Sequence, residues 1–273
     1  MRGPRVALRA GSILSAAVLV LVLVLPAAAL AAGHANLDEG RPLPFEDPYP
    51  VPRGEWSFEL GGGYENRRLG PYQDARLGRD QVQFPLEIVY GAVLNAQISA
   101  GIAFFTHKDS SGTSVRVGDV RVAGLYNFSQ ESTTLPALGL KYTLDLPTGT
   151  DSHGVDAQVK ALVTKSISRV SFHANFSELL IGERSFGERS SRSGIDLGSS
   201  FPLGAMHTRT LLLVGWFSEQ APLRGDDNRT GIELGFRRQQ TTRTVLRAGI
   251  GTESGGGFDG TSVSVNAGLS WSY

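Results

Sequence analysis

The sequence predicts an all-β fold: a transmembrane antiparallel up-and-down β-barrel of twelve strands, with short periplasmic turns and longer extracellular loops. Three observations predict it. Residues 263–273 alternate without a break between apolar and polar side chains and end on an aromatic residue. Residues 1–32 have the features of a cleavable export signal. Long and short connections alternate along the chain, as they do in bacterial outer-membrane barrels.

The N-terminal segment resembles a signal peptide in its order of charge, apolar run and small residues. Arg2, Arg5 and Arg9 form a positive start, an apolar run covers 13–25, and an alanine-rich stretch follows. A transmembrane anchor is the alternative, but the apolar run is shorter than the ~20 residues that span a bilayer. The alanines are typical of a cleavage site. We therefore expect residues 1–32 to be removed from an exported protein.

The composition of the remaining chain excludes several classes. About 240 residues remain after cleavage, enough for one barrel-sized domain. Of 26 basic residues three belong to the signal, which leaves 23 beside 26 acidic ones, so we expect no nucleic-acid partner. Cysteine is absent, which excludes disulfides and thiolate metal sites. The mature chain has no run of 18 apolar residues, whereas strands with apolar residues at alternate positions can cross a membrane.

Residues 33–53 contain five of the 13 prolines and cannot form a helix or a central strand. We interpret them as an extended periplasmic N-terminal segment that precedes a barrel at 54–273. A periplasmic partner motif and a partial plug are alternatives. A linker is favoured, because ~20 residues are too few to fold alone.

Twelve strand candidates follow, each chosen because apolar and polar side chains alternate with the period of two that a strand imposes. In chain order they are 54–65, 80–90, 94–106, 116–128, 135–146, 157–167, 170–181, 193–202, 207–218, 229–238, 243–252 and 263–273.

The early strands differ in clarity. The first begins with a clean alternation of aromatic and acidic or hydroxyl residues. The second reads less cleanly and contains Pro85, which cannot donate to a ladder. The third follows a short gap. In the fourth, alternating Val, Gly, Tyr and Phe oppose Asp119 and Arg121, and in the fifth, leucines and a tyrosine oppose Lys141 and Asp145.

The later strands continue the pattern. The sixth and seventh set Asp156, Lys160 and His173 opposite apolar partners, and the eighth sets Asp196 against its isoleucine and leucine. The ninth is nearly continuously apolar at 211–214, so its facing is ambiguous. The tenth opposes Ile, Leu and Phe to acidic and basic residues. The eleventh precedes the terminal strand, which has the clearest alternation of all.

The connections alternate in length. Gaps after odd-numbered strands are mostly long and polar: 66–79, 107–115, 147–156, 182–192, 219–228 and 253–260. Gaps after even-numbered strands are short: 91–93, 129–134, 168–169, 203–206 and 239–242. This alternation is typical of a barrel with both termini in the periplasm and an even number of strands. A soluble sandwich gives no reason for it.

The facing of the side chains predicts a lumen. In hydrocarbon every backbone group must be paired, so strands survive only in a closed barrel whose apolar face meets lipid. The polar face then lines the interior, where charges would tune selectivity. The predicted lumen-lining residues are Glu55, Glu59, Asp119, Arg121, Lys141, Asp145, Asp156, Lys160, His173, Asp196, Glu233, Arg237 and Arg247.

Aromatic residues gather toward the strand ends, which suits the girdles of membrane barrels, although aromatic residues are enriched in any strand. The predicted membrane-interface aromatics are Trp56, Tyr64, Tyr126, Phe128, Trp216, Trp271 and Tyr273. We expect outer-membrane lipids and lipopolysaccharide to surround the barrel, and the barrel-assembly machinery to engage the C-terminal strand. A small-molecule solute would pass through the interior.

Three stretches, 117–128, 135–149 and 154–167, resemble a known family. They carry a Gly-Asp that opens a strand and a Pro-Thr-Gly that closes the next hairpin. The chain resembles the outer-membrane protein family linked to the meta-pathway of phenol degradation, whose members are often described as transporters. The resemblance implies an outer-membrane pore for small hydrophobic or aromatic compounds. It supplies no substrate-binding residues.

The sequence favours passive uptake of small molecules over catalysis. A lipid- or lipopolysaccharide-modifying enzyme on the same fold is the alternative, but His173 lacks a serine nucleophile at the spacing that outer-membrane phospholipases use. The five histidines lack metal-site spacing, and we expect no metal, no cofactor and no catalytic residue. A secreted soluble β-protein is the third hypothesis.

Overall fold

The computed structural model describes residues 43–66, 80–109, 112–150, 152–204 and 210–273. The expected signal peptide, 1–32, lies outside the described residues. Among those described, no helix is long and apolar enough to cross a membrane. The strands are β1 (Trp56–Asn66), β2 (Asp80–Val93), β3 (Ala96–Asp109), β4 (Gly112–Val117), β5 (Val120–Ser129), β6 (Ala137–Leu146), β7 (Asp156–Ile167), β8 (Val170–Leu180), β9 (Ser191–Pro202), β10 (Thr210–Glu219), β11 (Arg229–Gln239), β12 (Thr244–Gly255) and β13 (Phe258–Ser272).

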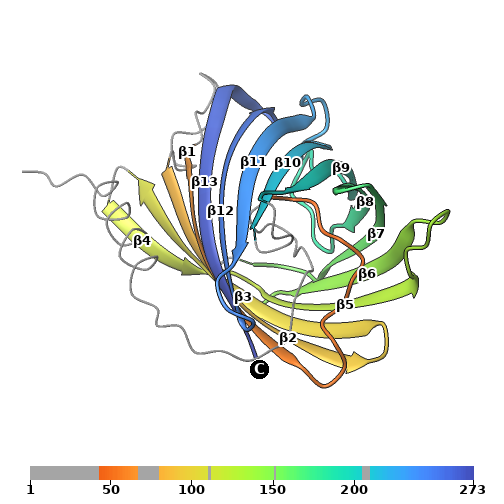
Figure 1. The fold of residues 1–273 in the computed structure, drawn as a ribbon. Helices are drawn as coiled ribbons and strands as arrows, with labels where there is room; N and C mark the ends of the chain where they lie inside the picture. Colours follow the sequence, from red (N-terminus) through yellow and green to blue (C-terminus); the bar gives the residue numbers. More distant parts are fainter. Residues whose placement is uncertain (1–42, 67–79, 110–111, 151, 205–209) are drawn as a thin grey trace, which may run out of the picture.

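The strands form one antiparallel sheet that closes on itself (Figure 1). Each strand pairs with the next along the chain, except that β3 pairs with both β4 and β5. β1 pairs with β13 over ten residue pairs, from Ser57 opposite Ser272 to Asn66 opposite Val263. β4 and β5 together make one barrel strand, so the barrel has twelve strands. The predicted fold class is confirmed, and closure leaves the barrel without the unpaired edge that hydrocarbon does not tolerate.

The break between β4 and β5 is a bulge. Phe104 of β3 faces Val117, whereas Gly101 of β3 faces Arg121, so one extra residue lies on the β4–β5 side. The amide of Gly118 still donates to the carbonyl of Ala103 over 2.7 Å. The predicted strand 116–128 is therefore present but bent by an inserted residue, a distortion that periodicity does not reveal.

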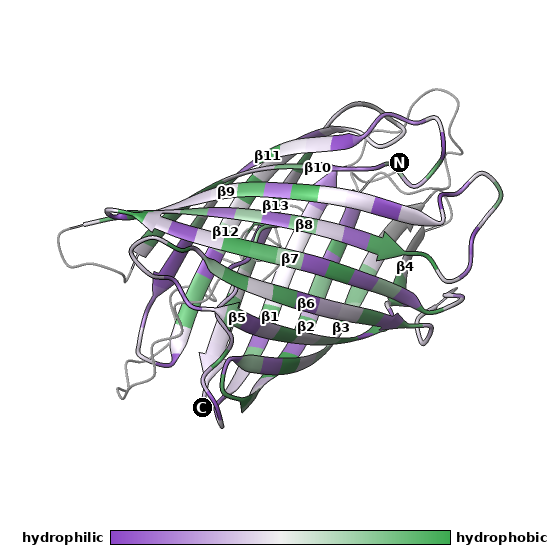
Figure 2. Cartoon of the chain, turned by 90° about the vertical axis from the view of Figure 1, so that its right-hand side faces the viewer, coloured by the Kyte–Doolittle hydropathy of each residue, from purple (hydrophilic) through white to green (hydrophobic). Residues whose placement is uncertain are grey.

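Large apolar side chains point out of the barrel. Ile98 on β3 is 55% exposed and Ile232 on β11 is 60% exposed, while hydroxyl and charged residues of the same strands are buried on the inner face. Figure 2 shows apolar and polar residues alternating along the strands. The hypothesis of a soluble two-sheet protein is wrong, because a single closed sheet turns its apolar face outward.

The sequence left the facing of β10 ambiguous, and the exposed fractions of its side chains settle it. Leu213 is 1% exposed and Phe217 is 5% exposed, while Val214 and Trp216 are 39% and 37% exposed. β10 therefore turns apolar residues both outward and inward, and it gives the barrel an apolar strip on its inner wall.

The connections alternate less strictly than expected. β1 begins and β13 ends at the same end of the barrel, which we call the turn end. At this end, residues 94–95, 168–169 and 240–243 connect strands. At the opposite loop end, 181–190 and 220–228 are longer. The expected long loop at 253–260 is instead a tight turn, because β12 and β13 extend to Gly255 and Phe258 and glycines with φ near 82°, 70° and 82° close the hairpin.

Candidate functional site in the barrel lumen

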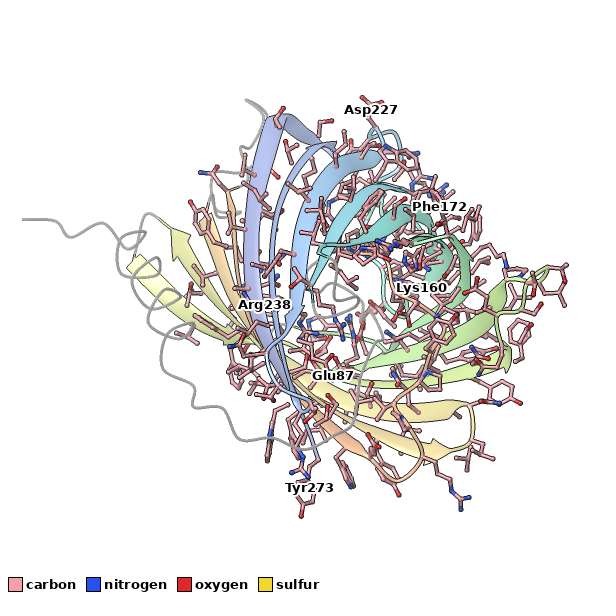
Figure 3. The ribbon with its side chains drawn as sticks, viewed as in Figure 1. Glu87, Lys160, Phe172, Asp227, Arg238 and Tyr273 are labelled. Carbon is pink, nitrogen blue, oxygen red and sulfur yellow. The ribbon has the colours of Figure 1, made fainter. Side chains whose placement is uncertain are left out.

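The predicted lumen-lining residues differ in their exposure. Lys160 points to the inner side of the wall in Figure 3, whereas Phe172 and Tyr273 point outward. The side chains that are nearly inaccessible to solvent are Glu59, Lys160, His173, Arg237 and Arg247. The partly buried ones are Glu55, Asp119, Lys141, Asp145, Asp156, Asp196 and Glu233, and Arg121 is exposed.

Two of the predicted residues form a buried ion pair across the barrel seam. Arg247 on β12 donates to the carboxylate of Glu59 on β1, and both side chains are 2% exposed. Ser57 and Ser270 donate to the same carboxylate over 2.7 and 2.6 Å. Because the charges are paired and hydrogen-bonded, their burial on the inner wall is tolerated.

Other predicted acids hold the connections at the loop end. Asp119 accepts hydrogen bonds from the amide of Gly149 over 2.9 Å and from the hydroxyl of Ser152 over 2.7 Å. Asp156 accepts from the amide of Gly182 over 2.9 Å. These carboxylates therefore fix the loops against the barrel wall.

Two more ion pairs lie toward the loop end. Arg121 and Asp145 face each other on β5 and β6 and form a bidentate pair at 2.7 and 2.9 Å. Arg229, which the sequence analysis did not select, pairs with Glu253 at 2.5 Å and lies 3.5 Å from Glu219. The loop end of the interior thus carries mixed charge.

The Pro-rich segment lies inside the barrel. Residues 43–53, which we call the strap, run from β9 and β10 past β6 and β5 to the start of β1 (the orange line in Figure 1). Leu43, Phe45 and Val51 are each 2% exposed. The sequence favoured a linker for this segment, whereas residues 43–53 pack against the inner wall. The partial plug, which the sequence left as an alternative, describes them better.

Glu46 of the strap is anchored among cations of the wall. Its carboxylate accepts a hydrogen bond from Lys141 over 2.7 Å, and the ammonium group of Lys160 is 3.7 Å away. Lys160 also lies 3.8 Å from Asp196. Glu46 and Lys160 are 4% and 3% exposed, so four charged groups meet in a site largely closed to solvent.

Side-chain amides bind the strap backbone. Asn175 accepts from the amide of Glu46 over 2.8 Å and donates to its carbonyl over 2.9 Å. Asn127 donates to the carbonyl of Pro48, and Gln97 accepts from the amide of Val51. Most backbone groups of the wall are used in the sheet, so side chains supply these partners for the strap.

Glycines make room for the strap. A Cβ atom at Gly198 of β9 would lie 2.3 Å from the ring of Phe45, and one at Gly139 of β6 would lie 2.7 Å from Pro48. Both distances are closer than real Cβ contacts come. The wall is therefore hollowed where the strap crosses it, and Phe45 stands between Gly198 and the apolar strip of β10.

His173 is one of the wall residues on which the strap packs, and we call these residues the strap seat. Its two ring nitrogens lie 2.9 Å from the hydroxyl of Thr164 and 3.1 Å from that of Ser200, and the ring of Phe45 stacks on it with centroids 5.1 Å apart. A lipid-modifying enzyme would need its catalytic histidine on the lipid-facing rim. His173 is instead buried on the inner face, and both of its ring nitrogens are hydrogen-bonded to hydroxyl groups rather than to a carboxylate.

The strap is tethered at the turn end. The hydroxyl of Tyr49 donates to Glu131 over 3.2 Å, and Ser166 donates to Glu131 through its amide and hydroxyl over 2.6 and 3.0 Å. Burial and the neighbouring Glu131 raise the pKa of Tyr49, which keeps it a neutral donor. Burial would raise the pKa of Glu131, but the hydrogen bonds from Ser166, Tyr49 and Lys165 outweigh it and lower that pKa.

Periodicity did not reveal the residues that hold the strap against the wall. They are Leu43, Phe45, Glu46, Gln97, Asn127, Thr164, Asn175, Gly139 and Gly198. A usable signal was the spacing of the prolines: between Pro44 and Pro52, four prolines leave few backbone donors to satisfy, and apolar residues stand between them.

The predicted interface aromatics lie on the outside. Trp56 packs on Tyr90 with ring centroids 4.4 Å apart, and Trp271 lies 5.8 Å from Phe58 and 6.3 Å from Tyr273. This group surrounds the junction of β1 and β13 at the turn end. Tyr126 and Phe128 are more than half exposed. Tyr64 and Trp216 are the predicted aromatics nearest the loop end.

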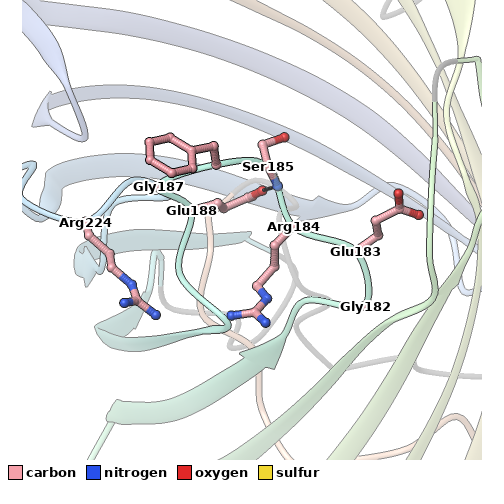
Figure 4. A pocket seen from close by; sticks show the side chains of 8 residues that line it. Gly182, Glu183, Arg184, Ser185, Gly187, Glu188 and Arg224 are labelled. Carbon is pink, nitrogen blue, oxygen red and sulfur yellow. Dashed lines mark hydrogen bonds between the residues drawn. The ribbon is translucent and has the colours of Figure 1, made fainter.

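A cavity of about 660 Å³ opens between the loops at the loop end (Figure 4). Residues 182–188 and Arg224 line it, and the amide of Ser185 donates to Glu188 over 2.9 Å. Phe186 at its edge is fully exposed. Among the described residues, no group of three His, Cys, Asp or Glu side chains could hold a metal ion.

The fold is similar to those of solved outer-membrane channels. The COG4313 outer membrane channel from Pseudomonas putida F1 has a TM-score of 0.66 at 13% identity, over 87% of this chain and 100% of that one. The NanC porin gives 0.55 at 11% identity over 78% and 98% of the two chains. The KdgM porin in complex with disordered oligogalacturonate gives 0.55 at 7% over 80% and 99%. No protein-family model and no curated protein sequence matches the chain.

Proposed function

We propose that this protein is an outer-membrane channel that admits small molecules passively. One observation carries the proposal: a closed twelve-stranded barrel turns apolar side chains outward and a charged, hydrogen-bonded set inward. An apolar outer face is stable only in lipid, and a polar inner face can hold water and solute. The similarity to one solved outer-membrane channel and two porins supports the same function.

Further expectations belong to this proposal. Outer-membrane lipids and lipopolysaccharide would surround the barrel. The assembly machinery would engage β13, and Tyr273, which follows it, forms two backbone hydrogen bonds with Trp56 at the barrel seam. The inward apolar strip of β10 packs against Leu43 and Phe45 of the strap, so the expectation of a hydrophobic or aromatic solute comes from the sequence resemblance. The phenol pathway rests on the sequence resemblance alone.

Osmotic swelling of liposomes tests the channel. The refolded protein is reconstituted, and swelling is followed in isotonic arabinose, raffinose, benzoate and gluconate. We expect arabinose to enter faster than the larger raffinose, and benzoate faster than the aliphatic gluconate. Protein-free liposomes give the background. Swelling at the background rate in every solute, with protein that is folded and inserted, would contradict a channel.

A further inference from the structure

We propose that the strap is the constriction of the channel and that Glu46 sets its charge selectivity. The inference rests on the proposed channel function and deepens it. The strap crosses the inner wall from Gly215 on β10 to Gly91 on β2, and between them its Glu46 binds the cations of β6 and β7. The strap therefore occupies the lumen along much of its circumference.

Size supports the first half of the proposal. Twelve strands about 4.8 Å apart and tilted by about 40° enclose a barrel about 24 Å across between opposite backbones. Inward side chains take about 5 Å from each wall, since facing sheets pack about 10 Å apart. A further chain lying on one wall removes about 5 to 10 Å more. The passage is therefore narrowest where the strap lies.

The strap is held by side chains, so it could leave the wall without breaking the hydrogen bonds between the strands. Backbone groups of residues 46–51 form hydrogen bonds with the side chains of Asn175, Asn127, Gln97 and Asp47. It contributes no strand to the sheet. Removing or shifting the strap would thus leave the ladder of the barrel intact.

Charge supports the second half. Lys141 and Lys160 are two cations, and Asp196 is one nearby anion. Glu46 balances them, so neutralising Glu46 adds one positive charge at the narrow section. A charge in a low-dielectric constriction acts strongly on passing ions, and rings of charge set selectivity in pores. The lumen should therefore become more permeable to anions.

Single-channel recording in planar bilayers tests this. The proteins are the mature chain, Glu46→Gln, a deletion of 33–50, and Asp227→Asn, a control on the loop between β10 and β11, at the far end of the barrel from the turn end (Figure 3). Conductance is measured in symmetric KCl, and the chloride-to-potassium permeability ratio is obtained from the reversal potential in a salt gradient. Folding of each variant is checked by heat-modifiable electrophoretic mobility.

We expect Glu46→Gln to raise the chloride-to-potassium ratio about threefold and the deletion to raise conductance at least about twofold, while Asp227→Asn matches the wild type. A wild type that is silent beside a conducting deletion also supports the proposal. If wild type and deletion conduct equally and Glu46→Gln matches Asp227→Asn, the strap is not the constriction. If all four folded proteins are silent, the channel function itself is contradicted, and the constriction with it.

Discussion

At the scale of residues, the inner wall contains ion pairs of two kinds. Glu59 and Arg247 are almost fully buried and share their hydrogen bonds with two serines. Arg121 and Asp145 have good bidentate geometry but are exposed by 54% and 21%. The two pairs should therefore differ in what they contribute to stability, although the same alternating pattern predicted all four residues as lumen-lining.

Removing one partner from each pair measures this difference. We expect Glu59→Gln to lower the free energy of unfolding by about 3 to 5 kcal/mol, because it removes the carboxylate charge that pairs with the buried Arg247 guanidinium. Asp145→Asn, on an exposed pair, should cost less than about 1 kcal/mol. Urea unfolding in detergent gives both values. Equal losses in the two variants would show that burial does not distinguish the pairs.

The hydrogen bonds that tether Tyr49 to Glu131 make the stability of the folded protein depend on pH. The pKa of Glu131 is lowered in the folded protein from an ordinary value of 4.5, so its contribution to stability is complete above pH 4.5 and is lost as the pH falls through the lower folded value. We expect the difference in urea midpoint between wild type and Glu131→Gln to be constant above pH 4.5 and to shrink below it. A difference that grows as the pH falls would contradict this sign.

At the scale of elements, the strands were predictable and the strap was not. A strand buries one face, so its period of two appears in the sequence, and the ranges of the twelve strands were found to within a few residues except near turns such as 253–260. The strap has no such period. Its burial depends on Asn175, Gly198 and other residues far away in sequence, and its prolines indicate only an extended chain.

A wall substitution tests whether the strap seat depends on shape. Gly198→Val places a side chain where the ring of Phe45 now lies, 2.3 Å from the new Cβ atom, so we expect the strap to be displaced. The chain contains no cysteine, which allows Leu43→Cys to serve as the only thiol. Its modification by a water-soluble reagent should be at least about tenfold faster with Gly198→Val, since Leu43 is otherwise buried.

Gly62→Val, on the outer face of β1, is the matched control. A Cβ atom there would meet only Phe84 at ordinary contact distance, 3.8 Å, so the labelling rate of Leu43→Cys should not change. Equal rates in the two variants would mean that Phe45 does not hold the strap in its seat.

At the scale of the whole molecule, the account depends on the orientation of one closed sheet. The sequence predicted this orientation from alternation, loop lengths and the aromatic end, and the structure shows the apolar face outside. The interior could be predicted only as a set of polar positions, because pairing across a lumen depends on curvature and on the strap. Glu59 and Arg247, 188 positions apart, illustrate this.

Adjacent cysteines on β13 test the orientation most directly. Ser264→Cys and Val265→Cys are introduced one at a time, and the reconstituted proteins are treated in liposomes with a membrane-impermeant thiol reagent. Ser264 lies on the inner face, and Val265, 48% exposed, lies on the outer face. We predict that the thiol at 264 reacts and the thiol at 265 is protected by lipid. Rapid reaction at 265 with protection at 264 would contradict the account.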